Sequence, residues 1–159
     1  MENVNEYLNF KCTNKDRYVE NNINLSQLDA TDEKIYFHVC EDVDLIFKVF
    51  NIPQNKCGYL YWRDAAFLYI MSNDLKPSIC NEIYPLIAKK FGKTKAAIDR
   101  AMNRCLENVL YHISKKGDSF LFTYFKNSLL YPKNGEILAM IVEVISSSKF
   151  QNSKMNLLI

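Results

Sequence analysis

Apolar residues recur at helical spacing along most of the chain, and no segment carries a convincing hairpin signal. The first 28 residues differ, because they are rich in asparagine and lack clear periodicity. They predict a loosely structured arm. From residue 31 the pattern predicts a helix to about residue 51, with Thr31 as N-cap and Pro53 just beyond its end. Residues 35–40 could alternatively form a short strand. The apolar positions of this helix are Ile35, Val39, Val43, Ile46 or Phe47, and Phe50.

Residues with special backbone properties mark where the other helices begin. Gly58 opens the second helix, and Ser78 caps a short helical turn over residues 78–84. Pro85 suits the first position of a new helix, because its missing N–H would have no partner there anyway. Asn134 is a good N-cap for the last helix. The predicted helices cover residues 31–51, 59–73, 85–91, 95–114, 118–125 and 134–147.

Residues 84–105 have the residue types that a helix-turn-helix needs at its tight points. Ala88 is small where the second helix must cross closely. Gly92, four residues later, can take the left-handed conformation that ends the first helix. Ile98 is expected to be the apolar plug between the two helices. The expected fold is therefore all-α, with about six helices around a helix-turn-helix and no wing.

Basic residues concentrate on the outer face of this hairpin. Residues 89–104 hold six Lys or Arg and one acid, a net charge of +5. Cations and helix N-terminal N–H groups bind phosphates, and Arg or Asn can reach base edges in the major groove. A solvated basic face is the alternative. The candidate DNA-binding residues are Lys89, Lys90, Lys93, Thr94, Lys95, Ala97, Arg100, Asn103 and Arg104.

The composition is that of one compact globular domain, since 48% of the 159 residues are hydrophobic and 24% are charged. The longest apolar stretch, residues 65–71, is far short of the roughly 20 residues that cross a bilayer. Residues 1–6 lack the basic and apolar regions of a signal peptide. We therefore expect a soluble, cytoplasmic protein without a membrane partner.

The formal net charge of +2 hides an asymmetry along the chain. Residues 1–45 carry a net charge of −6 and residues 46–159 carry +8. This asymmetry suggests an acidic flank on a basic body that faces nucleic acid, although an accidental dipole is the alternative. The acidic arm could fold back over residues 89–104 and compete with phosphates. Alternatively, residues 35–40 pack into the body and extend the helix that follows.

Metal, cofactor and enzyme chemistry find little support in the sequence. His38 and Cys40 form an isolated pair, and His112 has no partner. There is no Gly-rich phosphate loop, no spaced carboxylate pair and no nucleophile with a histidine partner. We therefore expect no catalytic residue, no metal and no cofactor. The five cysteines are too widely spaced for a zinc or redox motif and are expected to be reduced and mostly buried: Cys12, Cys40, Cys57, Cys80 and Cys105.

Four segments carry a more specific pattern, and they occur in a fixed order. They are GYLYWRDA at 58–65, IYPLIAKKF at 83–91, IDRA at 98–101 and PKNGEILAMI at 132–141. Together they resemble the C-terminal effector domain of the stage-zero sporulation response regulator of Firmicutes. The resemblance covers residues 43–145. It implies a six-helix, helix-turn-helix DNA-binding domain that regulates transcription at entry to sporulation. It also implies docking as tandem copies on an operator and contact with the sigma subunit of RNA polymerase.

Two departures from the family pattern matter. In the family a phosphorylated receiver domain precedes the effector domain, but 42 residues are too few for a doubly wound receiver, so control by phosphorylation through this chain is not implied. Arg100 is retained, but Ala97 and Asn103 stand where the resemblance has Arg, and Arg104 where it has His. Alanine cannot bridge guanine O6 and N7, so the family's operator does not carry over. The expected organisation is an acidic, partly ordered arm (1–42), the effector domain (43–148) and a tail (149–159).

Two functions of different classes are compatible with these residues. The first is a sequence-specific double-stranded DNA-binding transcription regulator without its own receiver, acting as a homodimer or as tandem copies. Lys93, Lys95, Arg100 and Arg104 favour it. The second is an interaction protein that reads no DNA and pairs with a full-length regulator or with RNA polymerase, which Ala97 favours.

Overall fold

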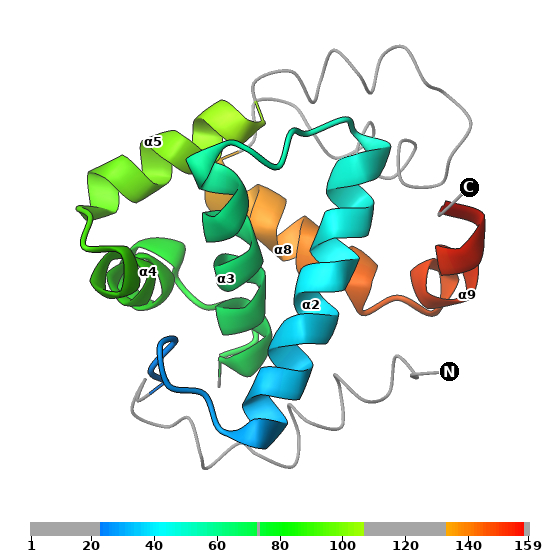
Figure 1. The fold of residues 1–159 in the computed structure, drawn as a ribbon, viewed down its shortest axis with the longest axis horizontal. Coiled ribbons are helices and arrows are strands. Elements are labelled where there is room, and N and C mark those ends of the chain that lie inside the picture. Colours follow the sequence, from blue (N-terminus) through cyan, green and yellow to red (C-terminus); the bar gives the residue numbers. More distant parts are fainter. Residues whose placement is uncertain (1–22, 73, 107–132, 158–159) are drawn as a thin grey trace.

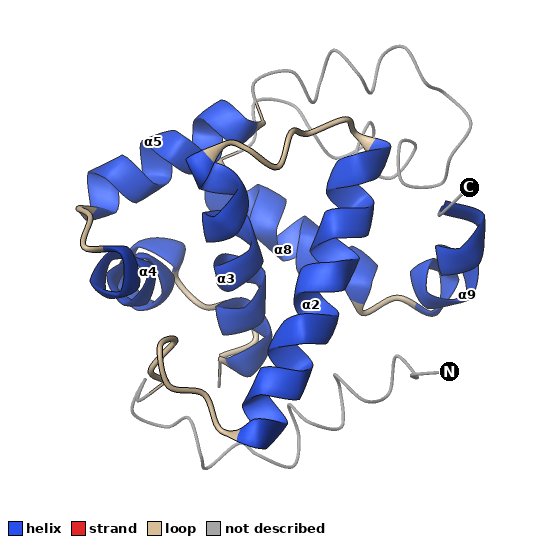
Figure 2. Ribbon diagram, viewed as in Figure 1, coloured by secondary structure: helices blue, strands red, loops and turns tan. Residues whose placement is uncertain are grey.

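The computed structural model describes residues 23–72, 74–106 and 133–157, and these residues form helices joined by loops, without a strand (Figures 1 and 2). The all-α prediction is confirmed. The described part contains six α-helices and one π-helical turn. They are α2 (Ala30–Val49), α3 (Cys57–Met71), the turn η2 (Ile79–Ile83), α4 (Tyr84–Phe91), α5 (Lys95–Cys105), α8 (Asn134–Ile145) and α9 (Ser148–Leu157).

Helix α3 lies at the centre of this arrangement, between α2 on one side and α4 and α5 on the other, with α8 behind it (Figure 1). Twelve of its 15 residues are buried. A helix that is packed on all sides needs apolar residues all round rather than one apolar stripe. Trp62, at 0% exposure, donates its indole N–H to the Met102 carbonyl at 3.0 Å. This bond ties the central helix to α5.

The start of helix α2 differs from the prediction. Asp29, not Thr31, is the N-cap, and its carboxylate accepts a hydrogen bond from the Asp32 N–H at 2.8 Å. Aspartate is a better N-cap than threonine, because its carboxylate also suits the positive end of the helix dipole. The N-cap therefore lies two residues earlier than the pattern indicates.

Helix α2 runs unbroken through residues 35–40, so the alternative of a strand there is wrong. Val39 and Cys40 are buried, and this half of the helix packs onto the body. Helix α2 continues without a break through residue 42, the last residue of the expected acidic arm. The helix ends at Val49, earlier than predicted, because Asn51 has a φ of 56° in the left-handed region. Asparagine tolerates that conformation better than most residues.

Gly58 has a packing role and not the expected opening role. It lies in the first turn of α3, and Lys56 is the N-cap. A Cβ atom at Gly58 would lie 2.0 Å from the Ala101 carbonyl oxygen and 2.5 Å from the carbonyl carbon. The missing side chain therefore lets α3 and α5 approach to backbone contact.

Ser78 has the role that the sequence predicts, whereas Pro85 is the second residue of its helix and not the first. The Ser78 hydroxyl accepts a hydrogen bond from the Asn81 N–H at 3.3 Å, and the Glu82 carboxylate accepts one from the Ser78 N–H at 2.6 Å. This reciprocal cap begins the turn η2. Helix α4 starts at Tyr84, with Pro85 in its first turn.

Asn134 is the first residue of α8 and not its N-cap, which is Lys133. The Glu136 carboxylate accepts a hydrogen bond from the Lys133 N–H at 3.3 Å, so Glu136 supplies a cap that the prediction assigned to Asn134. The Asn134 side chain is instead buried. Its amide donates hydrogen bonds to Tyr84 of α4 and to Asp99 of α5.

Helix α9 lies in the stretch that the sequence presents as a tail. Its Phe150 is fully buried, and Lys154 Nζ lies 2.7 Å from the buried Asp42 carboxylate of α2. The segment is mostly polar and has one buried aromatic residue, so its hydrophobic pattern is too weak to predict a helix.

Helix α5 is shorter than predicted. It ends at Cys105, because Leu106 leaves the helical conformation and its N–H bonds to the Asn103 carbonyl at 3.1 Å. Residues 107–114, the predicted helix over 118–125, Cys12 and His112 all lie outside the described residues.

Candidate nucleic-acid interface

Helices α4 and α5 form a tight hairpin at one side of the fold (Figure 1). Gly92 ends α4 with a φ of 63°, the left-handed conformation that the sequence predicts. The next N–H, that of Lys93, donates to the Ala88 carbonyl at 3.1 Å. Thr94 then caps α5, because its hydroxyl accepts a hydrogen bond from the Ala97 N–H at 3.1 Å. The two caps produce the short turn of a helix-turn-helix.

The inner face of the hairpin is apolar. Ile87 and Ile98 are fully buried, so Ile98 occupies the plug position that the sequence assigns to it. Ala88, Phe91 and Ala101 are half-buried and pack against the same core. The two helices are therefore held by contacts that leave their other faces free to carry charge.

Gly92→Val is expected to lower the free energy of unfolding by roughly 1–2 kcal/mol, because a β-branched residue is strained at positive φ. No heavy atom lies within 4 Å of a Cβ at this position, so the cost is conformational and not steric. Chemical denaturation measures the effect, and Gly92→Asn is the control because asparagine tolerates this conformation. Equal losses in the two variants would contradict the conformational explanation.

The exposed face of the hairpin carries most of the candidate DNA-binding residues. Ala97 is half-buried, and it precedes Arg100 by one turn on α5. The first turn of α5 contains no acidic residue. A basic helix with such an end can bind phosphates and present side chains to base edges. The exposed candidates are Lys89, Lys93, Thr94, Lys95, Arg100, Asn103 and Arg104.

Lys90 does not belong to this exposed face. Its Nζ lies 2.9 Å from the Asp64 carboxylate of α3, whose side chain is 1% exposed. The ammonium group also lies over the rings of Tyr36 and Phe91, 5.4 and 5.2 Å from their centres. Of the candidate residues, this lysine faces the body of the protein.

Asp99 anchors α5 to two other helices. Its Oδ1 accepts hydrogen bonds from the Tyr84 hydroxyl of α4 at 2.5 Å and from the Asn134 amide of α8 at 3.1 Å. Burial and the bond to Asp99 raise the pKa of Tyr84 well above its ordinary value, so this hydroxyl stays a donor. Sequence reasoning missed this cluster, because its members are 15 and 35 residues apart.

The described cysteines differ in their exposure to solvent. Cys40 and Cys105 are buried, and burial raises the pKa of both thiols. Cys57 and Cys80 are exposed, so the expectation of mostly buried cysteines holds for half of the four described.

Within the described ranges no three His, Cys, Asp or Glu side chains are placed to hold a metal ion. No helix in these ranges is long and apolar enough to cross a membrane.

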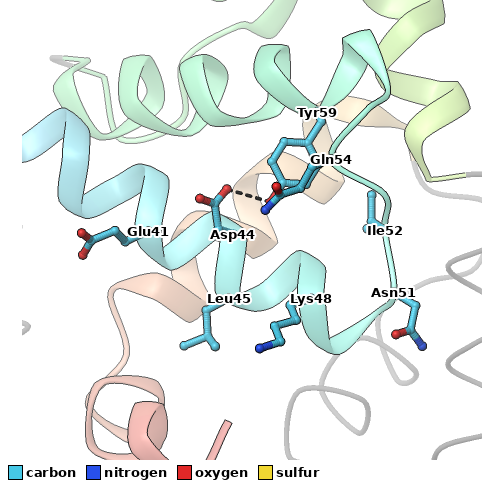
Figure 3. Close-up of a pocket in the computed structure, with 8 residues that line it drawn as sticks. All are labelled: Glu41, Asp44, Leu45, Lys48, Asn51, Ile52, Gln54 and Tyr59. Atoms are coloured by element: carbon cyan, nitrogen blue, oxygen red, sulfur yellow. Dashed lines mark hydrogen bonds between the residues drawn. The ribbon is translucent and has the colours of Figure 1, made fainter. Parts of the chain in front are cut away.

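A cavity of about 450 Å³ opens beside the C-terminal half of α2 (Figure 3). The Tyr59 hydroxyl donates to the Asp44 carboxylate at 2.7 Å within its wall. None of its lining residues belongs to α4 or α5, so it is separate from the basic face. The lining residues are Glu41, Asp44, Leu45, Lys48, Asn51, Ile52, Gln54 and Tyr59.

Comparison with known proteins finds a matching protein family. Residues 43–145, about two thirds of the chain, match the family described as "Sporulation initiation factor Spo0A C terminal". No solved structure matches the chain. The family is one of DNA-binding transcription-factor domains and not of enzymes. The chain therefore belongs to the Spo0A C-terminal family of DNA-binding domains that regulate transcription in sporulation.

Proposed function

We propose that the chain is a sequence-specific regulator of transcription that places α5 in the major groove of double-stranded DNA. The observation that carries this proposal is the exposed basic face of a hairpin whose inner face is fixed in the core. Lys93, Thr94 and Lys95, at the N-terminal end of α5, are suited to phosphates. Arg100 and Asn103, further along the same helix, are suited to base edges.

DNA binding in this proposal does not require phosphorylation of a receiver in the same chain. The residues directly before the matched span, 30–42, are part of helix α2. The proposed place of action is the cytoplasm. The proposed partners are double-stranded DNA, a second copy of the chain bound in tandem or as a homodimer, and the sigma subunit of RNA polymerase.

Selection of bound fragments from random duplex DNA, followed by a salt titration on the selected duplex, tests this function. We expect one enriched sequence and a logarithmic salt dependence with a slope of about −0.9 for each phosphate contact. A steep slope without any enriched sequence would show phosphate binding alone, and would contradict sequence-specific regulation.

The second candidate function is an interaction protein that reads no DNA. Ala97 supports it, because this position on the outer face of α5 offers no hydrogen-bond donor to a base. In that case no duplex would be retained even at low salt, while the chain would bind a full-length family regulator or the sigma subunit directly. Titration of the same preparation with duplex DNA at low salt separates the two functions, because only the first function includes binding to DNA.

A further inference from the structure

A polar cluster around one buried carboxylate joins three helices behind the basic face. It consists of Tyr36 of α2, Asp64 of α3 and Lys90 of α4. The Tyr36 hydroxyl donates to Asp64 Oδ1 at 2.5 Å, and Lys90 Nζ donates to Asp64 Oδ2 at 2.9 Å. Each carboxylate oxygen therefore has its own donor, and the donors come from helices on opposite sides of α3 (Figure 1).

The Asp64 carboxylate has lost its hydration, because its side chain is almost completely removed from solvent. Its side chain is 1% exposed, whereas that of Lys90 is 25% exposed. A buried carboxylate needs a cation and further hydrogen bonds to offset the loss of its hydration. Burial, together with the neighbouring Asp64, raises the pKa of Tyr36 well above its ordinary value, which keeps its hydroxyl protonated. The geometry therefore satisfies the carboxylate from both sides.

Aromatic rings also contact two members of this cluster, Lys90 and Tyr36. Lys90 Nζ lies over the Tyr36 and Phe91 rings, and the Tyr36 ring packs edge-on against Phe67 of α3 with 5.3 Å between centres. Tyr36 thus contacts α3 through both its ring and its hydroxyl while its ring faces the Lys90 ammonium. A shift of α4 along α3 would break both the ion pair with Asp64 and the contact of the Lys90 ammonium with the Tyr36 ring.

We propose that Tyr36, Asp64 and Lys90 position helix α4 of the hairpin, and that Lys90 contributes to DNA binding through this placement and not through a phosphate contact. The proposal rests on the proposed DNA-binding function. It assigns a role to Tyr36, which lies outside the span that matches the family. Lys89 and Lys90 are adjacent in sequence but differ in role, since Lys89 is exposed to solvent.

The matched variants Lys89→Met and Lys90→Met test the two roles. Lys90→Met should lower the melting temperature by roughly 10 °C, because it leaves the Asp64 carboxylate buried without a cation. It should weaken DNA binding while leaving the salt slope at the wild-type value. Lys89→Met should leave the melting temperature unchanged and reduce the magnitude of the slope by about 0.9. A Lys90→Met variant with an unchanged melting temperature and a slope reduced by that amount would overturn the proposal.

The double variant Asp64→Asn/Lys90→Met gives a test that needs no DNA. If the pair is a buried one, removing both charges should restore part of the melting temperature that Lys90→Met loses. Lys90→Arg, which keeps the cation, should also restore it. A double variant that melts at or below the temperature of Lys90→Met would overturn the cluster whatever the chain does to DNA. Absence of DNA binding by the wild-type chain would instead overturn the proposed function.

Tyr36→Phe covers the case in which Lys90→Met does not fold. It removes one hydroxyl and keeps the ring, so the loss of DNA affinity should be about tenfold at most. The salt slope should not change. Wild-type affinity and wild-type melting temperature in Tyr36→Phe would together overturn the positioning role of Tyr36.

Discussion

Gly58→Ala should destabilise the protein by roughly 3 kcal/mol or more, because the added methyl group meets backbone and cannot be accommodated by a side-chain rotation. The new Cβ would lie 2.0 Å from the Ala101 carbonyl oxygen. Helix α5 would have to move away from α3, which strains the bond between Trp62 and Met102. Trp62 is the one tryptophan of the chain, so its fluorescence during urea unfolding reports directly on this contact.

Gly135→Ala is the matched control for that measurement. A Cβ at Gly135, within α8, would lie 3.4 Å from the Ile79 Cγ2 atom, which is an ordinary contact with a side chain. Alanine is also the better helix former, by about 1 kcal/mol. The control should therefore be neutral or stabilising. If Gly58→Ala were as stable as Gly135→Ala, the backbone contact between α3 and α5 would be wrong.

The sequence predicts those parts of the fold that depend on residues close to one another in the chain. Ser78, Pro85 and Gly92 act on their own turns, so their residue types are sufficient to indicate where η2, α4 and the hairpin turn lie. Asp29 shows the limit of this reasoning, since two neighbouring residues could each cap α2 and the pattern favoured the wrong one. Helix α9 shows another limit, because its formation depends on burying Phe150 against distant helices.

The candidate interface divides in the same way. Helical periodicity places Arg100 and Arg104 on one face of α5 from the sequence alone. It cannot separate Lys89 from Lys90, because the difference lies in Asp64, 26 residues away. It also gives Gly58 a local role, although the residue is constrained by Ala101 on another helix. Close approaches between helices are tertiary properties that a hydrophobic pattern does not encode.

Arg100→Ala is expected to weaken binding to the selected duplex about 5- to 150-fold, the effect of losing roughly 1–3 kcal/mol of base recognition. Arg100 is exposed on α5, and it makes no ion pair with another described residue. Ala97, one turn earlier, has no donor that could share the task. Asp99 beside it is held by Tyr84 and Asn134, which fixes the helix from which Arg100 projects. Base preference should relax at one position of the site.

Lys93→Ala is the control, because Lys93 is exposed in the turn before α5 and is expected to contact phosphate. It should weaken selected and unrelated duplexes alike and reduce the magnitude of the salt slope by about 0.9. Titrations of both duplexes with both variants separate the two kinds of contact. An equal loss on the two duplexes in Arg100→Ala would make Arg100 a phosphate contact. No loss on either would mean that α5 is not the helix that reads the DNA.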